Sequence, residues 1–416
     1  MRTNLTRMTA VAAILFASLF WLSCGDTYRP VITPLPQPGG DPQGASRAIV
    51  LATGGTTQPG ATNNIDVSGD TDVGNVYVGE DPVMIALSGT SAYVVNHGSR
   101  NLTLYSTFFT SGNPTTITLT QTASPVFAAI TSGDVYVADP ANNAVDVVSN
   151  GNVTTGSIAV GTNPVALAGT PDGTKLYVVN QGSDSVSVIT TTDNLKQFDI
   201  PLMAGAAPSY AIATPDSKWI FVAESGTGKI AIISTADGSV TEVDATTPAN
   251  AAAGPSYMKF DNTLKRVYVA NTAGNSISIF DETGTMPALL ATVAVGTAPT
   301  SVAPLSDGSR AYVANQGSGT VSVVDVKSFT KTKDIAVAAA GEQVMWVAAS
   351  SDATKVYAAV KGPNDTSDPG FTAVIPTATD AILTKIPPPR IDPNCNPATS
   401  PVPCTYTQPI MVVTTP

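Results

Sequence analysis

The hydrophobic and polar positions of this chain repeat along most of its length. An aromatic residue, two small or β-branched residues and a polar residue recur, with the aromatic residues 41 to 47 positions apart. Six copies lie at 93–96, 136–139, 177–180, 221–224, 268–271 and 312–315, and a decayed copy follows at 357–360. A fixed period of this length, made only of strands and turns, predicts the blades of a β-propeller in an all-β protein.

Each repeat reads as four short strands, here called A to D. In the third repeat strand A begins at Pro164, and the turn Pro171-Asp172-Gly173 leads into strand B, which carries the Tyr-Val motif. Strand C alternates between apolar and polar residues, as in Val-Ser-Val-Ile at 186–189, and this period of two indicates a strand. The short strand D ends in a Gly-x-x-Pro turn, as at 161–164.

The strand pattern also predicts how the ring closes. An eighth set of strands is split between the two ends of the chain, with strands B, C and D at 48–51, 64–67 and 75–79 and strand A at 408–413. A shared blade leaves no free sheet edge, so we favour eight blades over seven blades with spare terminal strands. The other seven sets begin near Pro82, Pro125, Pro164, Pro208, Pro255, Pro299 and Val344.

Composition narrows the class of protein. Only 12% of the residues are charged and the formal net charge is −11. A disordered chain needs more charge and fewer apolar residues, so we expect an ordered protein. Nucleic acid is excluded as a partner, because its phosphates require a basic surface and no basic run occurs. We expect a monomer.

The first residues have the features of an export signal. Arg2 and Arg7 precede an uncharged stretch over 8–22, which is short for a membrane span, and Cys24 follows. This pattern resembles a bacterial lipoprotein signal in which Cys24 is lipidated; an ordinary secretory signal or an uncleaved anchor is the alternative. The sequence thus divides into a signal peptide (1–23), a Pro- and Gly-rich tether (24–45) and a propeller (46–416), with the protein anchored in the bacterial cell envelope, periplasmic or at the cell surface.

The repeat resembles the YVTN β-propeller family. That family carries a Pro-Asp-Gly turn, a Tyr-Val-x-Asn strand and a Val-Ser-Val-Ile strand, and these elements recur in order over 46–416. The resemblance implies a propeller among surface and envelope proteins. Signatures of WD40 and kelch repeats are absent from the sequence.

Two cysteines remain once Cys24 is assigned to lipid. Cys395 and Cys404 form an even pair in an exported protein, which favours a disulfide. A metal site is the weaker interpretation, because no His or third Cys lies near them.

Three long loops are expected on one face of the ring. This top face carries the B–C turns and the D-to-A connections, and the loops span 54–63, 361–370 and 387–407. Function concentrates in loops on rigid scaffolds, although insertions near a ring closure are also tolerated without a function. In the second loop Asp365 and Asp368 are candidate ligands of Ca²⁺, and two solvated loop acids are the simpler explanation.

The polar residues that end the Tyr-Val motifs form a second set of candidate ligand contacts on the top face. Asn, Asp and Glu side chains can also satisfy backbone hydrogen-bonding groups at strand ends. This structural role is the alternative to ligand binding. The candidates are Asn96, Asp139, Asn180, Glu224, Asn271 and Asn315.

Several chemistries lack the residues they need. His97 is the only histidine, which excludes a site built from several imidazoles, and the sequence contains no Cys-x-x-Cys-His, Walker, Gly-x-Ser-x-Gly or His-Glu-x-x-His motif. We therefore expect no cofactor, no metal and no catalytic residue. Trp219 and Trp346 are interpreted as packing residues.

Three hypotheses for function follow. The favoured one is a non-enzymatic, lipid-anchored envelope propeller that binds a protein, a polysaccharide or another surface component, with a protein or glycan partner at the top face. The second is a hydrolase, because propellers similar to this one include lactonases. The third is a structural subunit of an envelope or redox assembly.

Overall fold

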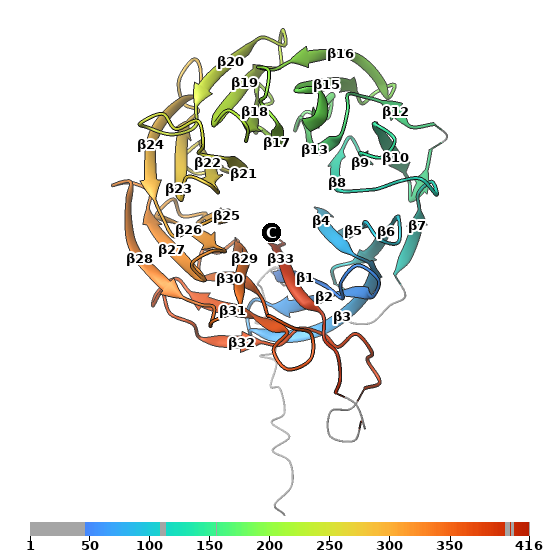
Figure 1. The fold of residues 1–416 in the computed structure, drawn as a ribbon, viewed down its shortest axis with the longest axis vertical. Coiled ribbons are helices and arrows are strands. Elements are labelled where there is room, and N and C mark those ends of the chain that lie inside the picture. The colour runs from blue at the N-terminus through green and yellow to red at the C-terminus, as the bar shows by residue number, and fades with distance from the viewer. Residues whose placement is uncertain (1–45, 109–113, 155, 396–399, 401–402, 416) are drawn as a thin grey trace, which may run out of the picture. The chain divides into compact units, whose positions relative to one another are not determined.

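The computed structural model describes residues 46–108, 114–154, 156–395, 400 and 403–415. Eight sheets stand side by side around a central channel and form a β-propeller (Figure 1). The predicted signal peptide, Cys24 and the tether lie outside the described residues. Within the described part, no helix has the length and apolar character needed to cross a membrane.

The blades are numbered here from the one that the two ends of the chain share. Blade 1 contains β33 (Gln408–Thr414), β1 (Arg47–Thr53), β2 (Pro59–Asp66) and β3 (Thr71–Glu80). Blade 2 contains β4 (Pro82–Ser88), β5 (Ser91–Asn96), β6 (Asn101–Ser106) and β7 (Thr115–Thr118). Blade 3 contains β8 (Phe127–Thr131), β9 (Asp134–Asp139), β10 (Ala144–Ser149) and two short outer pieces, β11 (Asn152–Val153) and β12 (Ile158–Ala159).

The next blades follow the same order from the channel outwards. Blade 4 contains β13 (Pro164–Gly169), β14 (Lys175–Asn180), β15 (Ser185–Thr190) and β16 (Leu195–Pro201), with the 3₁₀ turn η1 (Gln181–Ser183). Blade 5 contains β17 (Pro208–Ala213), β18 (Trp219–Glu224), β19 (Lys229–Ser234) and β20 (Val240–Asp244). Blade 6 contains β21 (Pro255–Asp261), β22 (Arg266–Asn271), β23 (Ser276–Asp281) and β24 (Ala288–Ala294).

Two further blades complete the ring. Blade 7 contains β25 (Pro299–Pro304), β26 (Arg310–Asn315), β27 (Thr320–Asp325) and β28 (Thr330–Ala336). Blade 8 contains β29 (Gln343–Ala349), β30 (Lys355–Lys361), β31 (Gly370–Pro376) and β32 (Thr384–Ile386). The prediction of eight blades is confirmed.

The closing blade is shared as the sequence predicts. The C-terminal strand β33 is its innermost strand and pairs antiparallel with β1, with Val412 opposite Val50. In Figure 1 the red strand β33 lies beside the blue strand β1, and β2 lies on the other side of β1. Strand β2 begins at Pro59, before the predicted start, so the first of the three top-face loops is shorter than expected.

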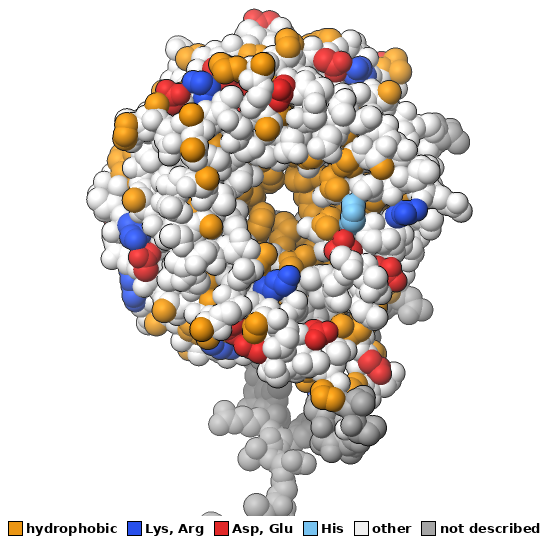
Figure 2. All heavy atoms as spheres, viewed as in Figure 1, with side chains coloured by type: hydrophobic (Ala, Val, Ile, Leu, Met, Phe, Trp, Pro, Cys, Tyr) orange, Lys and Arg blue, Asp and Glu red, His pale blue; other side chains and the backbone are white. Residues whose placement is uncertain are grey.

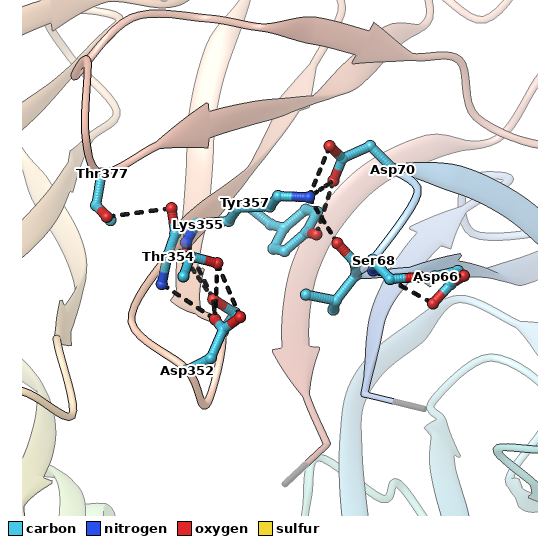
Figure 3. A network of polar contacts seen from close by, with 10 residues as sticks. Asp66, Ser68, Asp70, Asp352, Thr354, Lys355, Tyr357 and Thr377 are labelled. Atoms are coloured by element: carbon cyan, nitrogen blue, oxygen red, sulfur yellow. Dashed lines mark hydrogen bonds and ion pairs between the residues drawn. The ribbon is translucent and has the colours of Figure 1, made fainter. Parts of the chain in front are cut away.

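A polar contact joins blade 8 to the closing blade (Figure 3). Lys355 Nζ donates to both carboxylate oxygens of Asp70, at 2.9 and 2.8 Å, and to the carbonyl of Val67 at 2.6 Å. Tyr357 also donates its hydroxyl to Asp70, at 3.1 Å. The side chains of Lys355 and Asp70 are only 17% and 12% exposed, so this ion pair lies largely out of solvent at the seam of the ring.

The aromatic residue of each Tyr-Val motif fills the space between blades. Tyr136, Tyr177, Tyr268 and Tyr312 are fully buried or nearly so. Two of their hydroxyls reach the next blade, since Tyr136 donates to Asn194 Oδ1 at 2.7 Å and Tyr312 donates to Asp380. Burying a large ring at the same position of most repeats gives the motif its period, because the interfaces between blades need a similar volume filled.

The innermost strands share a local irregularity at their first residues. In blades 2, 4, 5, 6 and 7 the strand begins at a proline, and the pairing with strand B shifts by one residue directly after it. Such a β-bulge changes which side chains face each side of the strand. It therefore decides which residues line the channel.

Candidate functional site in the central channel

One residue of each innermost strand occupies an equivalent position just below the bulge. Each lies opposite the residue two places after the aromatic position of its own Tyr-Val strand, as Tyr257 lies opposite Ala270. These eight residues form an upper ring around the channel, and six of them line its cavities. The upper ring contains Met411, Met84, Phe127, Ala166, Tyr210, Tyr257, Ser301 and Trp346.

Four aromatic residues of the upper ring contact one another around one side of the channel. The ring centroids of Phe127 and Tyr210 are 5.8 Å apart, those of Tyr210 and Tyr257 are 5.1 Å apart, and those of Tyr257 and Trp346 are 4.7 Å apart. Edge-on and tilted contacts of this kind are favourable between aromatic rings. We call these four residues the aromatic arc.

Small residues in two blades make the arc continuous. Phe127 and Tyr210 come from blades 3 and 5, and blade 4 between them carries Ala166; Tyr257 and Trp346 come from blades 6 and 8, and blade 7 carries Ser301. Both small residues are fully buried. The large rings can therefore meet across a blade that contributes no bulk of its own.

Cavities lie on both sides of the arc. The upper one has a volume of about 660 Å³ and includes Met84, Phe127, Thr300 and Lys361 in its walls. The lower one has a volume of about 360 Å³, and Tyr210, Tyr257 and Trp346 belong to the walls of both. Figure 2 shows hydrophobic side chains around the central opening. Apolar concave sites with a few polar groups are the usual form of small-molecule sites.

A lower ring follows two residues further along each innermost strand. Since alternate residues of a strand face the same way, these side chains also face the channel. Seven of the eight are apolar and the eighth is Lys259, which lies in the wall of the lower cavity. The lower ring contains Val413, Ala86, Ala129, Ala168, Ile212, Lys259, Ala303 and Ala348.

Lys259 is an amine without a counter-ion. It is the only cationic residue in the eight innermost strands, and among the described residues no hydrogen bond or ion pair joins its Nζ to another group. Its side chain is exposed to solvent within the wall of the lower cavity. The residues packed around it partly desolvate the amine, and this desolvation lowers the pKa of Lys259. The amine of Lys259 therefore loses its proton at a lower pH than the amine of an ordinary lysine.

The two tyrosines of the arc have the opposite tendency. Burial raises the pKa of Tyr210 and of Tyr257 above the ordinary value, so both hydroxyls keep their protons. In the described part of the chain neither hydroxyl has a hydrogen-bond partner. Each is a free donor inside the channel, and the site can thus offer a base and proton donors to one bound molecule.

The polar residues at the ends of the Tyr-Val motifs do not line this channel. All six are fully buried within the blades. In blade 4, Asn180 Nδ2 donates to Ser187 Oγ at 2.9 Å, and Ser187 donates to Asp199 Oδ1 at 2.6 Å, so the amide holds neighbouring strands together. Asn96, Asn271 and Asn315 make the equivalent contacts with a Thr or Ser of strand C at 2.8 or 2.9 Å.

The two acidic members of that set are bonded in other ways. Asp139 accepts a hydrogen bond from the backbone of Ser124 at 3.0 Å, and Glu224 accepts one from the Thr227 hydroxyl at 2.8 Å. None of the six side chains has an exposed surface through which a ligand could be contacted. Their geometry supports a structural role, but five of the six bond side-chain hydroxyls and Asp139 bonds a backbone group, which differs from the expected pairing with backbone at strand ends. A role in ligand binding stays an untested prediction.

The top-face loops partly gather as expected. The backbone N–H of Tyr406 donates to the carbonyl of Asp365 at 2.7 Å, and Gln408 Nε2 donates to the carbonyl of Gly362 at 2.9 Å, which brings the second and third loops together. The Asp365 side chain is exposed and that of Asp368 is half-buried. Among the described residues no three His, Cys, Asp or Glu side chains cluster as a metal site would require. A Ca²⁺ site at Asp365 and Asp368 stays a prediction.

The cysteine pair lies in the third of these loops. The Cα atoms of Cys395 and Cys404 are 5.8 Å apart, a separation that a disulfide can span. Most of the residues between them lie outside the described part of the chain. The disulfide therefore stays a prediction.

The channel residues were missed at the level of sequence. Trp346 was interpreted as a packing residue, and Lys259 was not among the candidate site residues. One signal was available: Tyr257-Met258-Lys259 places an aromatic residue and a lysine on the same side of a strand that carries no charged residue in the other repeats. The bulge after each proline hides which side that is.

Comparison with known proteins gives one family match. A family model described as lactonase, 7-bladed β-propeller, matches residues 131–256, which run from the end of β8 to the second residue of β21. The match covers less than half of the chain and ends directly before Tyr257. No curated protein matches the chain.

Solved propellers are similar in fold at low identity. Dihydro-haem d1 dehydrogenase NirN has a TM-score of 0.65 and 10% identity, with 92% of this chain and 78% of that chain covered. A putative 6-phosphogluconolactonase from Bacteroides fragilis has a TM-score of 0.56 and 18% identity, covering 72% and 97%. A streptogramin B lyase has a TM-score of 0.53 and 17% identity, covering 67% and 89%. At these identities the likeness concerns the fold.

These findings correct one expectation from the sequence. The chain was expected not to be an enzyme, yet the family model that it matches is one of lactonases, and the similar structures include a lyase and a putative lactonase. The expectation rested on the absence of known catalytic motifs, which says little about a channel whose lining only the fold brings together. The comparisons support a β-propeller that resembles enzymatic propellers.

Proposed function

We propose that the protein is an enzyme that binds a lactone in the central channel and opens its ring. The observation that carries this proposal is the arrangement of the channel: Lys259 and two tyrosines of the aromatic arc belong to the wall of the same lower cavity, and neither the amine nor the two hydroxyls have a partner among the described residues. A cyclic ester needs an apolar surface for its ring and polar groups for its carbonyl, and the cavity offers both. The lactonase family match lends support.

The test is a ring-opening assay on the fragment 45–416. This fragment forms one compact unit and contains all eight blades with both closing strands. Acid released from a panel of alkyl and sugar lactones is followed with a pH indicator at low buffer concentration. We expect saturable opening of at least one lactone, and no opening above the background rate for the whole panel would contradict the proposal.

A pair of tryptophan variants locates the activity. Trp346→Ala removes the last ring of the arc and should raise KM by about tenfold or more, since an indole buries a large apolar surface. Trp219→Phe is the control, because Trp219 packs against the core between blades 5 and 6, away from the channel. Equal effects of both variants, or none, would place the substrate elsewhere.

We also propose that Cys24 carries a lipid that anchors the enzyme in the cell envelope. The apolar stretch before Cys24 and the Pro-rich stretch after it support this location. Cys24→Ala should move the protein from the membrane fraction to the soluble fraction. An unchanged distribution would argue against lipid attachment at this residue.

A further inference from the structure

The chemistry of ring opening can be assigned to particular residues of the channel, an inference that rests on the proposed function. Tyr257 and Lys259 are separated by one residue on β21 and therefore project from the same side of the strand. Both contribute to the wall of the lower cavity. A molecule bound against the Tyr257 ring therefore lies close to the side chain of Lys259, which is two residues further along the same face of the strand.

Hydrolysis of an ester makes two demands that this pair can meet. The attacking water must lose a proton to a base, and the carbonyl oxygen must be stabilised while it carries negative charge. An amine in a desolvated channel is available as a base in its neutral form, and a buried phenol that keeps its proton is available as a donor. The other lower-ring residues are apolar and can do neither.

We propose that Lys259 is the general base and Tyr257 the hydrogen-bond donor to the carbonyl oxygen in the hydrolysis of an uncharged lactone with an apolar substituent. Lys259 Nζ removes a proton from water while the water oxygen forms a bond with the carbonyl carbon. The bond between that carbon and the ring oxygen then breaks, and the ring oxygen takes the proton from the Lys259 ammonium. Lactone and water give one hydroxy acid, and the lysine returns to its neutral form.

The class of substrate follows from the charges in the channel. The walls of the two cavities contain three charged side chains, Asp81 and Lys361 in the upper cavity and Lys259 in the lower one. A phosphate is normally held by several donors or by an arginine, and no arginine lines either cavity. A phosphate near Lys259 would also hold the amine in its charged form and remove the base. The apolar walls instead suit an alkyl or aryl substituent.

The experiment compares two lactones and four variants. δ-Decalactone and 6-phosphogluconolactone are offered to the fragment 45–416 and to Lys259→Met, Lys259→Arg, Tyr257→Phe and Lys265→Met. Lys265 is the matched control, since it is an exposed lysine of the turn that follows β21. Circular dichroism and the melting temperature of each variant show whether its fold is intact.

We expect δ-decalactone to be opened with the higher kcat/KM. Lys259→Met should lower this kcat/KM by about 100-fold or more, and Tyr257→Phe by about 100-fold, mostly through kcat. Lys259→Arg should be as inactive as Lys259→Met, because a guanidinium stays protonated in proteins. In the original enzyme log kcat/KM should rise with pH and level off below the ordinary lysine pKa of about 10.4, and this inflection should be absent in Lys259→Met.

The failures can be told apart. If the original fragment opens no lactone, the proposed function is wrong and this assignment fails with it. If it opens lactones but Lys259→Met or Lys259→Arg keeps the rate and the pH profile, the assignment to Lys259 is overturned while the proposed function stands. A preference for 6-phosphogluconolactone would overturn the class of substrate.

Discussion

Glu224 makes the stability of the propeller depend on pH. Its carboxyl is fully buried in blade 5. At the equivalent position, blades 4 and 7 carry the neutral side chains of Asn180 and Asn315. Burial raises the pKa of Glu224 to about 7, and the neighbouring Glu242 carboxyl adds to the effect. Glu224 Oε1 and Glu242 Oε2 are both buried without a donor, and one proton shared between them would satisfy both oxygens.

The magnitude follows from the difference between the folded and unfolded states. The unfolded chain loses the proton of Glu224 near the ordinary pKa of 4.5, and the folded chain keeps it up to about 7. At about 1.4 kcal/mol per pKa unit, this difference corresponds to about 3 kcal/mol of unfolding free energy. That stability is present below pH 4.5 and is lost as the pH rises through 7.

Glu224→Gln removes the titration and keeps a donor for Glu242. We expect the original fragment 45–416 to lose about 2.5 kcal/mol of unfolding free energy between pH 5 and pH 8 through this site, and the variant to lose that much less. Urea denaturation at intervals of one pH unit, followed by tryptophan fluorescence, measures the difference. Glu80→Gln, at an exposed position, is the control and should leave the pH dependence unchanged. Parallel pH curves for the original and Glu224→Gln fragments would refute the reasoning.

Three further predictions concern stability. Asp70→Ala leaves the largely buried Lys355 amine without its counter-ion at the seam of the ring. It should lower the unfolding free energy, measured by urea denaturation, by about 3 kcal/mol, and a change below about 1 kcal/mol would mean that the seam depends on strand pairing alone. Gly296→Ala places a Cβ within 2.6 Å of Cγ of the fully buried Asn315, and should cost about 1 to 3 kcal/mol, whereas an unchanged melting temperature would show that Asn315 can move. Peptide mapping without reductant should recover Cys395 joined to Cys404, and a free thiol at Cys395 would contradict this pairing. Cys395→Ser should lower the unfolding free energy by about 2 to 3 kcal/mol.

The architecture could be predicted because its signals are local and repeated. The aromatic position of strand B is buried in the same way in several blades, as Tyr177 and Tyr312 show. The residues that pack these interfaces therefore recur at one period in the sequence. The shared blade followed from a missing strand A at one end of the chain and a spare strand at the other. Both features depend on pattern and not on distant contacts.

The channel could not be predicted in the same way. The contact between Tyr257 and Trp346 crosses blade 7, and it exists because Ser301 is small at the equivalent position. No short window of sequence contains these three residues. The contacts of the buried polar residues could not be predicted for a related reason, since Asn180 is placed among strand neighbours that only the pairing register identifies.

The fluorescence of Trp346 tests most directly whether the channel is the substrate site. The fragment 45–416 contains only Trp219 and Trp346, so Trp219→Phe leaves Trp346 as its single reporter. Titration of this variant with δ-decalactone should change the emission of Trp346 with a midpoint close to KM. Ring opening that proceeds normally without any change in Trp346 emission would contradict the account.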